Sequence, residues 1–262
     1  MSAWTEAPRV RAFLTAVQFL TQLPVPGGAT RDLATFPEDI RRGLAYFPLI
    51  GALIGLITAV ALSLSALVLP FALAVVVALA VEARVTGAFH EDAVADFCDA
   101  FGGGWTREDT LRILKDSRIG SFGALGLGLA VALRAIGLMA IGDFWLACMA
   151  LVVSGALGRL AILAVMALVP PVPAREGLSK DVGQVADWSV FCKGAMLVLP
   201  VVLPALFLDW IAILLSFVMI TAFVIWMRAL LMRWLGGVTG DCLGFTAYAA
   251  IVLTTIAFAR LR

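Results

Sequence analysis

The stretch GLAYFPLIGALIGLITAVALSLSALVL, residues 43–69, carries no charged side chain from one end to the other. A helix needs about 20 consecutive apolar residues to cross a bilayer, so this stretch predicts a membrane-spanning helix. The whole chain agrees, because 62% of its 262 residues are hydrophobic and its mean hydropathy is +1.03. Soluble domains are only about 45–50% apolar. We therefore expect an all-α fold, a polytopic integral membrane helical bundle, because a β-barrel would show short alternating strands instead.

More apolar blocks follow the first, and together they predict about seven transmembrane helices in a single domain over residues 1–262. The further blocks are 71–89, 119–141, 144–169, 195–208, 210–227 and 243–259. Short turns at residues 69–70, 142–143 and 209 are expected to join neighbouring blocks into tight hairpins. The apolar run at residues 12–20 is too short to span and is followed by no small-residue cleavage site. We expect an interfacial or re-entrant helix there.

The basic residues predict the orientation of the chain. With these spans, every long connection falls on one side, together with most of the 19 Lys and Arg residues, and only Arg260 and Arg262 fall opposite. Because positively charged loops stay inside, we expect a protein of the bacterial-type cytoplasmic (inner) membrane whose active site faces the cytoplasm. The net charge of +1 provides no bulk basic patch, so no nucleic acid partner is expected. A homo-oligomer is compatible with this arrangement.

An acidic cluster follows the second apolar block, in the stretch FHEDAVADFCDAFGGG at residues 89–104. Asp92, Asp96 and Asp99 follow the spacing D-x3-D-x2-D, so on a helix they lie within about 60° of one another on one face. Neighbouring carboxylates repel one another unless a cation lies among them. Carboxylate oxygens, with water completing the shell, suit Mg²⁺ and a phosphate substrate. We expect these three residues to bind Mg²⁺; the alternative is a solvated helix face.

Two further residues are candidate catalytic groups. His90 is the only histidine of the chain, and on a continuous helix it would point away from Asp92 and the other carboxylates. It can join the site only if the helix bends or begins nearby, which Gly87 permits; the alternative is a capping or packing histidine. Asp241 lies in GGVTGDCLG, residues 236–244, where glycines allow a close approach to a ligand, and is a candidate metal ligand or base.

Polar residues after the acidic cluster and later in the chain are candidate ligands of a phosphate-bearing substrate. They are Lys115, Asp116, Arg118, Arg175 and Lys180. The first three crowd the end of a predicted amphipathic helix at residues 106–118, which Thr106 is expected to cap. A Lys, an Arg and a carboxylate beside a glycine turn suit an anionic substrate. The alternative is an interfacial helix whose basic residues contact lipid headgroups.

Charged residues inside the apolar blocks also need an explanation. Arg159 lies within the block 144–169, where an uncompensated charge is costly, so we expect phosphate or an aspartate to pair with it. Glu82 and Arg84 are expected to pair with each other near the end of their span. Arg134 is expected to pair or to extend its head toward the interface.

Several motifs occur in a fixed order along the chain. They are FLTQLPVPGG at 19–28, GAFHEDAVADFCD at 87–99, KDSRIG at 115–120, REGL at 175–178 and GGVTGDCLG at 236–244. Together they resemble the cobalamin synthase family, the adenosylcobinamide-GDP ribazoletransferases, over nearly the whole chain. The combination is specific, whereas one motif alone is not. The chain departs from the family pattern at Glu91, where an apolar residue is usual, at Ala93, where Gly is usual, and at Phe245, where a small residue is common.

The resemblance implies a late step of the nucleotide-loop assembly of vitamin B12. In that step α-ribazole, or α-ribazole 5′-phosphate, is joined to adenosylcobinamide-GDP, and GMP leaves. The product is adenosylcobalamin or its 5′-phosphate, and the reaction uses Mg²⁺. Phosphoryl transfer needs mainly positioning and charge neutralisation, which the acidic cluster with Mg²⁺ and the basic residues would supply. Lys115, Arg118 and Arg159 would hold phosphate oxygens, and His90 or Asp241 would be the base.

Two alternatives also fit parts of the pattern. The first is another Mg²⁺-dependent membrane transferase, such as a CDP-alcohol phosphotransferase or an aspartate-rich prenyltransferase. The former would need an Arg where Asp96 stands, and the latter a second aspartate-rich motif, whereas Asp241 stands alone. The second alternative is a transporter or channel. A transporter should distribute polar groups through its spans, whereas here they gather at one face, which favours an enzyme.

Overall fold

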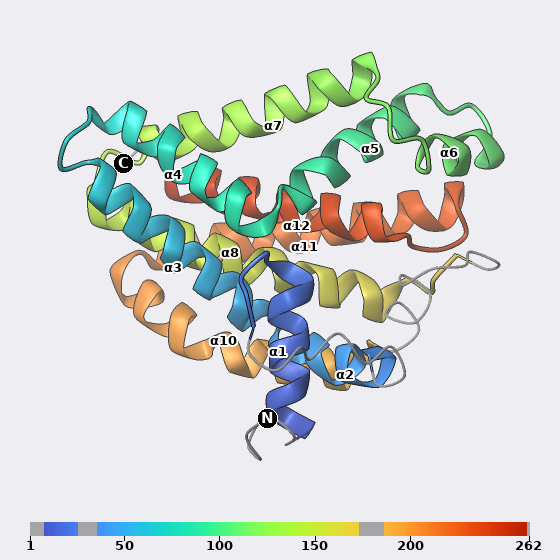
Figure 1. The fold of residues 1–262 in the computed structure, drawn as a ribbon, viewed down its shortest axis with the longest axis horizontal. Helices are drawn as coiled ribbons and strands as arrows, with labels where there is room; N and C mark the ends of the chain where they lie inside the picture. Colours follow the sequence, from blue (N-terminus) through green and yellow to red (C-terminus); the bar gives the residue numbers. More distant parts are fainter. Residues whose placement is uncertain (1–7, 26–35, 173–185, 261–262) are drawn as a thin grey trace.

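A computed structural model describes residues 8–25, 36–172 and 186–260 of the chain, and Figure 1 shows their all-helical arrangement. The helices are α1 (Pro8–Leu20), α2 (Phe36–Gly43), η2 (Leu44–Tyr46), α3 (Phe47–Ser65), α4 (Phe71–Thr86), α5 (Phe89–Gly103), α6 (Arg107–Ile113), α7 (Ser121–Ala140), α8 (Phe144–Leu168), α10 (Trp188–Leu208), α11 (Trp210–Trp234) and α12 (Gly240–Phe258). Within these residues β-structure is limited to one isolated bridge between Pro171 and Val238. The predicted all-α membrane bundle is confirmed.

Six helical segments of the described chain are long and apolar enough to cross a membrane, and a seventh span results if α4 and α5 count as one. The predicted number of about seven agrees with this range. The second predicted block differs in detail, because α4 ends at Thr86 and α5 leaves it at an angle of 90°. Gly87 and Ala88 make this bend with left-handed φ angles of 70° and 56°. Gly87 adopts such a conformation without cost, whereas a residue with a Cβ does not.

The predicted tight hairpins are present, and side chains at the turns begin the following helices. The Asp143 carboxylate accepts a hydrogen bond from the Leu146 amide at 2.8 Å, and Asp209 accepts one from the Ala212 amide at 3.0 Å. Asp209 also forms an ion pair with Arg260 at 2.6 Å. This pair fixes the start of α11 beside the end of α12. In Figure 1 the α3–α4 turn and the chain end lie at the left, and α6 lies at the right.

The core is built around α8, which is buried along most of its length and packs against α3 and α12. Glycines bring α3 and α8 into contact at the level of their backbones. A Cβ placed on Gly51 would overlap the carbonyl oxygen of Gly155, and one on Gly55 would overlap that of Leu151. Close approach of this kind is the usual way in which helices associate in lipid, where apolar burial alone gives no driving force.

The first helix, α1, is too short to cross a membrane, with 13 residues. It buries Ala12, Ala16 and Leu20 against α2 and α3, and an ion pair of 2.7 Å joins Arg11 to the buried Asp39. Figure 1 shows α1 running across the direction of the long helices. The predicted short N-terminal helix is thus present and lies crosswise, as an interfacial helix does.

Candidate functional site

The acidic cluster lies where α5 packs against α12. Asp92, Asp241 and Asp99 each lie close enough to Asp96 to repel its negative charge. The predicted carboxylates of α5 and the separate Asp241 are therefore brought together from two helices. Asp241 and the aspartates of α5 are more than about 140 positions apart in the sequence, so only the packing of the two helices brings them together.

Small residues allow this meeting of α5 and α12. A Cβ on Gly244 would overlap the Cβ of Ala93, so the two helices touch directly at this point. One turn on, the rings of Phe97 and Phe245 stack with their centroids 3.8 Å apart. Two of the departures from the family pattern, Ala93 and Phe245, thus lie on one helix contact, where Gly244 leaves space for Ala93 and Phe97 provides a ring for Phe245 to stack on.

The start of α12 is fixed by contacts of its own. Thr239 caps the helix by accepting a hydrogen bond from the Cys242 amide, which places Asp241 in the first turn. The segment before it is held to the end of α8, because the Val238 amide donates to the Pro170 carbonyl at 2.8 Å. The position of Asp241 is therefore fixed by the Thr239 cap of α12 and by the hydrogen bond to the segment that follows α8.

Asp99 has a structural task that its spacing does not predict. One of its carboxylate oxygens accepts a hydrogen bond from the Gly120 amide at 2.6 Å, and the other accepts one from the Gly123 amide at 2.8 Å. These amides belong to the first turn of α7, which has no intrahelical acceptor for them. Asp99 therefore caps α7 and ties it to α5, and both of its oxygens are occupied in this way.

His90 is brought into the site by the bend that Gly87 permits. Its side chain is only 2% exposed, and neither ring nitrogen has a hydrogen-bond partner in the structure. It lines a cavity together with Asp92 and Asp241. A buried imidazole without a partner is costly in a purely structural role, so a ligand in the cavity is the natural partner for it.

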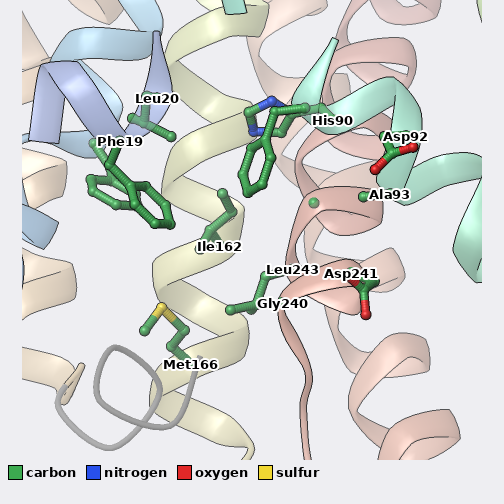
Figure 2. Close-up of a pocket in the computed structure, with 13 residues that line it drawn as sticks. Phe19, Leu20, His90, Asp92, Ala93, Ile162, Met166, Gly240, Asp241 and Leu243 are labelled. Atoms are coloured by element: carbon green, nitrogen blue, oxygen red, sulfur yellow. The ribbon is translucent and has the colours of Figure 1, made fainter. Parts of the chain in front are cut away.

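This cavity has a volume of about 250 Å³ and two chemically different ends (Figure 2). Its lining residues are Phe19, Leu20, Phe47, Phe89, His90, Asp92, Ala93, Ile162, Met166, Gly240, Asp241, Leu243 and Gly244. Figure 2 shows Asp92 and Asp241 on one side, with Phe19 and Leu20 on the other. We call it the apolar cavity, because among the described residues that line it only His90, Asp92 and Asp241 have polar side chains.

A second cavity, of about 650 Å³, adjoins the first at Asp92. It shares Phe19, Phe89 and Asp92 with the apolar cavity, and we call it the polar cavity. Its further polar side chains are Gln18, Thr21, Gln22, Thr86, Glu91, Asp96 and Ser117. Asp92 therefore stands between an apolar and a polar compartment.

The predicted phosphate ligands fall into three groups. Arg118 lines a third cavity, of about 480 Å³, together with Asp99 and Asp116, and Ile119 lines both this cavity and the polar one. Two guanidinium hydrogen bonds of 3.0 and 2.7 Å from Arg118 lower the pKa of the Asp116 carboxyl to about 2. Lys115 is exposed and does not line this cavity. Arg175 and Lys180 lie outside the described residues.

The helix predicted over residues 106–118 is shorter than expected. Thr106 caps it as predicted, with a hydrogen bond of 3.1 Å from the Asp109 amide, but α6 ends at Ile113. The chain then turns, which frees Arg118 to approach Asp116 and the cavity.

A buried ionic centre behind the site corrects one prediction and bears on another. Glu82 pairs with Arg134 at 2.7 Å and not with Arg84, which donates instead to the Gln22 side chain at 2.7 Å. Arg159 is 1% exposed and does not line the apolar cavity. Within the described part of the chain, its one hydrogen bond is a long one of 3.5 Å to the Gly155 carbonyl, and no aspartate there forms an ion pair with it. A phosphate partner for Arg159 stays a prediction.

Sequence patterns missed two contributors to this region. Glu91 lines the polar cavity and has a buried Oε2 without a hydrogen-bond partner among the described residues. Tyr248 stacks under the Arg134 guanidinium at 5.7 Å. No short sequence motif could have predicted either role, because the surroundings of both residues come from helices that are distant in sequence.

The carboxylates suit a hard cation by their chemistry. Within the described residues, neither Asp92 nor Asp96 takes part in an ion pair, although other carboxylates repel Asp96. As these side chains stand, no three His, Cys, Asp or Glu residues of the described part form a complete metal site. Two or three carboxylates with water completing the shell match the way in which proteins bind Mg²⁺. Asp92, Asp96 and Asp241 have the hard oxygen donors that such an ion prefers, whereas the oxygens of Asp99 already accept hydrogen bonds from two backbone amides.

Comparison with known proteins adds independent information. A family model described as "Cobalamin-5-phosphate synthase" matches residues 12–259. Three curated relatives carry the name adenosylcobinamide-GDP ribazoletransferase. The protein of Leptospira biflexa is 31% identical over 90% of each chain. The protein of Vibrio parahaemolyticus is 35% identical over 95% of this chain and 93% of its own, and that of Ralstonia pickettii is 37% identical over 89% of each. No solved structure matches the chain.

Proposed function

Because this chain belongs to the cobalamin-5-phosphate synthase family, we propose that it joins α-ribazole, or α-ribazole 5′-phosphate, to adenosylcobinamide-GDP with release of GMP. The observation that carries this proposal is the meeting of Asp92, Asp96 and Asp241 between two cavities of different polarity. A reaction that unites two large molecules through one phosphorus needs such a junction. The product would be adenosylcobalamin or its 5′-phosphate.

We propose that Asp92, Asp96 and Asp241 hold Mg²⁺. When bound there, the ion would neutralise charge on the pyrophosphate, which is its general contribution to phosphoryl transfer. The carboxylates have the hard oxygen donors that this ion prefers, and they come from helices whose positions are fixed by packing. Asp99 would support the site by holding α7 against α5.

The chain's own residues would position the reactants and take up the proton. A ribose hydroxyl of the acceptor attacks the phosphorus on the cobinamide side, and a new O–P bond forms as the bond to the GMP oxygen breaks. His90 is the base that we propose for the hydroxyl proton, because its unpartnered nitrogens lie at the same cavity end as Asp92. Arg118 is placed to contact phosphate oxygens of the donor, since it is exposed beside the third cavity.

We also propose that the site faces the cytoplasm from the inner membrane. The exposed basic residues of the connections support this orientation, because Arg107, Arg112 and Arg118 all lie at the α6 end of the molecule. Water-soluble nucleotide substrates would then reach the acidic cluster without crossing the bilayer.

The test is a reconstituted reaction with purified protein in nanodiscs. Adenosylcobinamide-GDP, α-ribazole and Mg²⁺ should give GMP and a cobalamin in equal amounts, and EDTA should stop the reaction. The matched comparison replaces α-ribazole by its 5′-phosphate, which should give the phosphorylated product. Absence of GMP release with both acceptors, from protein that is folded and membrane-inserted, would refute the proposed function.

A further inference from the structure

The two cavities that meet at Asp92 differ in chemistry, and this difference separates the two substrates. Phe19 and Phe89 form a wall that both cavities share, and Asp92 is the one charged residue common to both. A transferase must hold its donor and its acceptor at the same time, with the reacting phosphorus between them. Asp92 lines both cavities, so the reacting phosphorus is expected beside it.

The apolar cavity suits a molecule with a flat apolar body and a single polar end. Away from the carboxylates its walls are hydrocarbon, provided by Leu20, Phe47, Ile162, Met166 and Leu243. A group with several ring nitrogens or amino groups would lose hydrogen bonds to water there and gain none. A guanine base or the amide-bearing corrin of the donor therefore does not suit this wall.

We propose that the apolar cavity binds the acceptor nucleoside, with its apolar bicyclic base among Phe47, Ile162 and Met166 and its ribose directed toward His90, Asp92 and Asp241. This inference rests on the proposed function, since that function supplies the acceptor. The base of α-ribazole is a benzimidazole, which carries few polar groups at its edge. The attached ribose carries the hydroxyls that the polar end of the cavity can bind. The base is selected by the cavity wall, so these three apolar residues determine specificity.

The polar cavity is left for the donor. Gln18, Gln22 and Ser117 offer hydrogen-bonding groups in this cavity. Ile119 lines both the polar cavity and the third cavity, which Arg118 also lines. The polar groups of a nucleoside diphosphate find partners in such surroundings. The two substrates therefore meet at Asp92 from two adjoining cavities, which suits transfer of a group from one to the other.

Filling the apolar cavity tests the assignment by direct binding. Ile162→Trp places a large ring among its walls, and Ala164→Trp on the same helix is the matched control. Ala164 lines a separate apolar groove between α8, α10 and α11. Binding of α-ribazole alone is measured by calorimetry on nanodisc protein, without donor or Mg²⁺. Ile162→Trp should weaken it at least about tenfold, which is the scale at which hydrophobic pockets discriminate, and the control should bind like the wild type.

Steady-state kinetics provide a second readout. Ile162→Trp should raise the KM for α-ribazole by about tenfold or more and leave the KM for adenosylcobinamide-GDP within about twofold. An unchanged acceptor KM, or an equal rise for both substrates, would overturn the assignment. A wild-type protein that binds α-ribazole but releases no GMP would instead count against the proposed function, so the two failures are distinguishable.

A competition experiment on the wild-type protein avoids any folding defect of a variant. The α-riboside of adenine has the same sugar as α-ribazole but a base with several polar groups. It should displace α-ribazole at least about tenfold less well, because the apolar wall leaves these groups unpaired. Equal displacement would show that the base does not lie against the apolar wall, and would overturn the inference even if Ile162→Trp failed to fold.

Discussion

Three aspartates share one face of α5, yet the structure gives them different tasks. Asp92 and Asp96 lie beside Asp241 from α12, whereas both oxygens of Asp99 accept hydrogen bonds from backbone amides of α7. The spacing D-x3-D-x2-D correctly places the three side chains on one face. It says nothing of what lies opposite each of them, because the Gly120 and Gly123 amides come from the start of α7.

Removing charge from Asp92 or Asp96 should abolish metal binding and turnover while preserving shape. We expect Asp92→Asn and Asp96→Asn each to lower kcat/KM at least about 100-fold, the size of effect found when one charge-stabilising group is lost. Mn²⁺ binding, followed by electron paramagnetic resonance, should weaken in parallel. The control is Asp143→Asn, because asparagine caps a helix as well as aspartate does. Near-normal Mn²⁺ affinity in both variants would refute the metal assignment.

Asp99 should behave as a helix cap and not as a metal ligand. Asp99→Ala is expected to cost about 1–2 kcal/mol, since it leaves two amides of α7 without an acceptor. The melting temperature in detergent should fall for Asp99→Ala. It should fall less for Asp99→Asn, because the asparagine side chain keeps one oxygen that can accept an amide hydrogen bond. Mn²⁺ affinity of the folded Asp99→Asn protein should match the wild type. If that affinity falls as far as in Asp92→Asn, Asp99 is a ligand after all.

At the scale of helices, the decisive features are close contacts and one bend. The apolar blocks of the sequence locate the helices, but periodicity cannot show that Gly51 of α3 touches Gly155 of α8. Gly87 indicates that a bend is allowed, whereas its 90° angle also requires Ala88 in a left-handed conformation, which no pattern predicts. The pairing of Glu82 with Arg134 was missed for the same reason, because α4 and α7 meet only in the folded bundle.

Two glycines offer a matched test of the helix contacts. Gly51→Ala should destabilise the protein by about 1–3 kcal/mol, because its Cβ overlaps the Gly155 carbonyl and forces α3 from α8. Gly128→Ala on α7 meets no atom within 4 Å and should gain up to about 1 kcal/mol from helix propensity. Melting temperatures in detergent report both effects. Equal melting temperatures for the two variants would show that the α3–α8 contact is looser than described.

The architecture of the whole molecule could be predicted from the sequence more fully than the geometry of the site. Span number, hairpin turns and the crosswise first helix follow from hydropathy and charge, which are properties of the chain itself. The meeting of Asp92 with Asp241, and the separation of two cavities at that point, depend on packing between α5 and α12. The fold class could therefore be predicted, but the shape of the site could not.

The orientation can be measured with single cysteines in a cysteine-free background. Ser117→Cys lies at the α6 end, and Gly142→Cys lies in the tight turn between α7 and α8. A membrane-impermeant maleimide should label Ser117→Cys only in inverted inner-membrane vesicles and Gly142→Cys only in intact spheroplasts. The positive-inside rule is the reason for this expectation. The reverse labelling pattern would place the acidic cluster outside the cytoplasm.

The bend after α4 has a consequence for the lipid around the protein. With 16 residues, α4 is about 24 Å long, shorter than the roughly 30 Å of a typical hydrocarbon core. The rest of the crossing on this side belongs to α5, whose carboxylates need water. We therefore expect the bilayer beside α4 and α5 to be thinner than elsewhere, so that its thickness affects the site. Turnover should rise in vesicles of shorter acyl chains and fall as the chains lengthen, because hydrophobic mismatch works against the position of the bend.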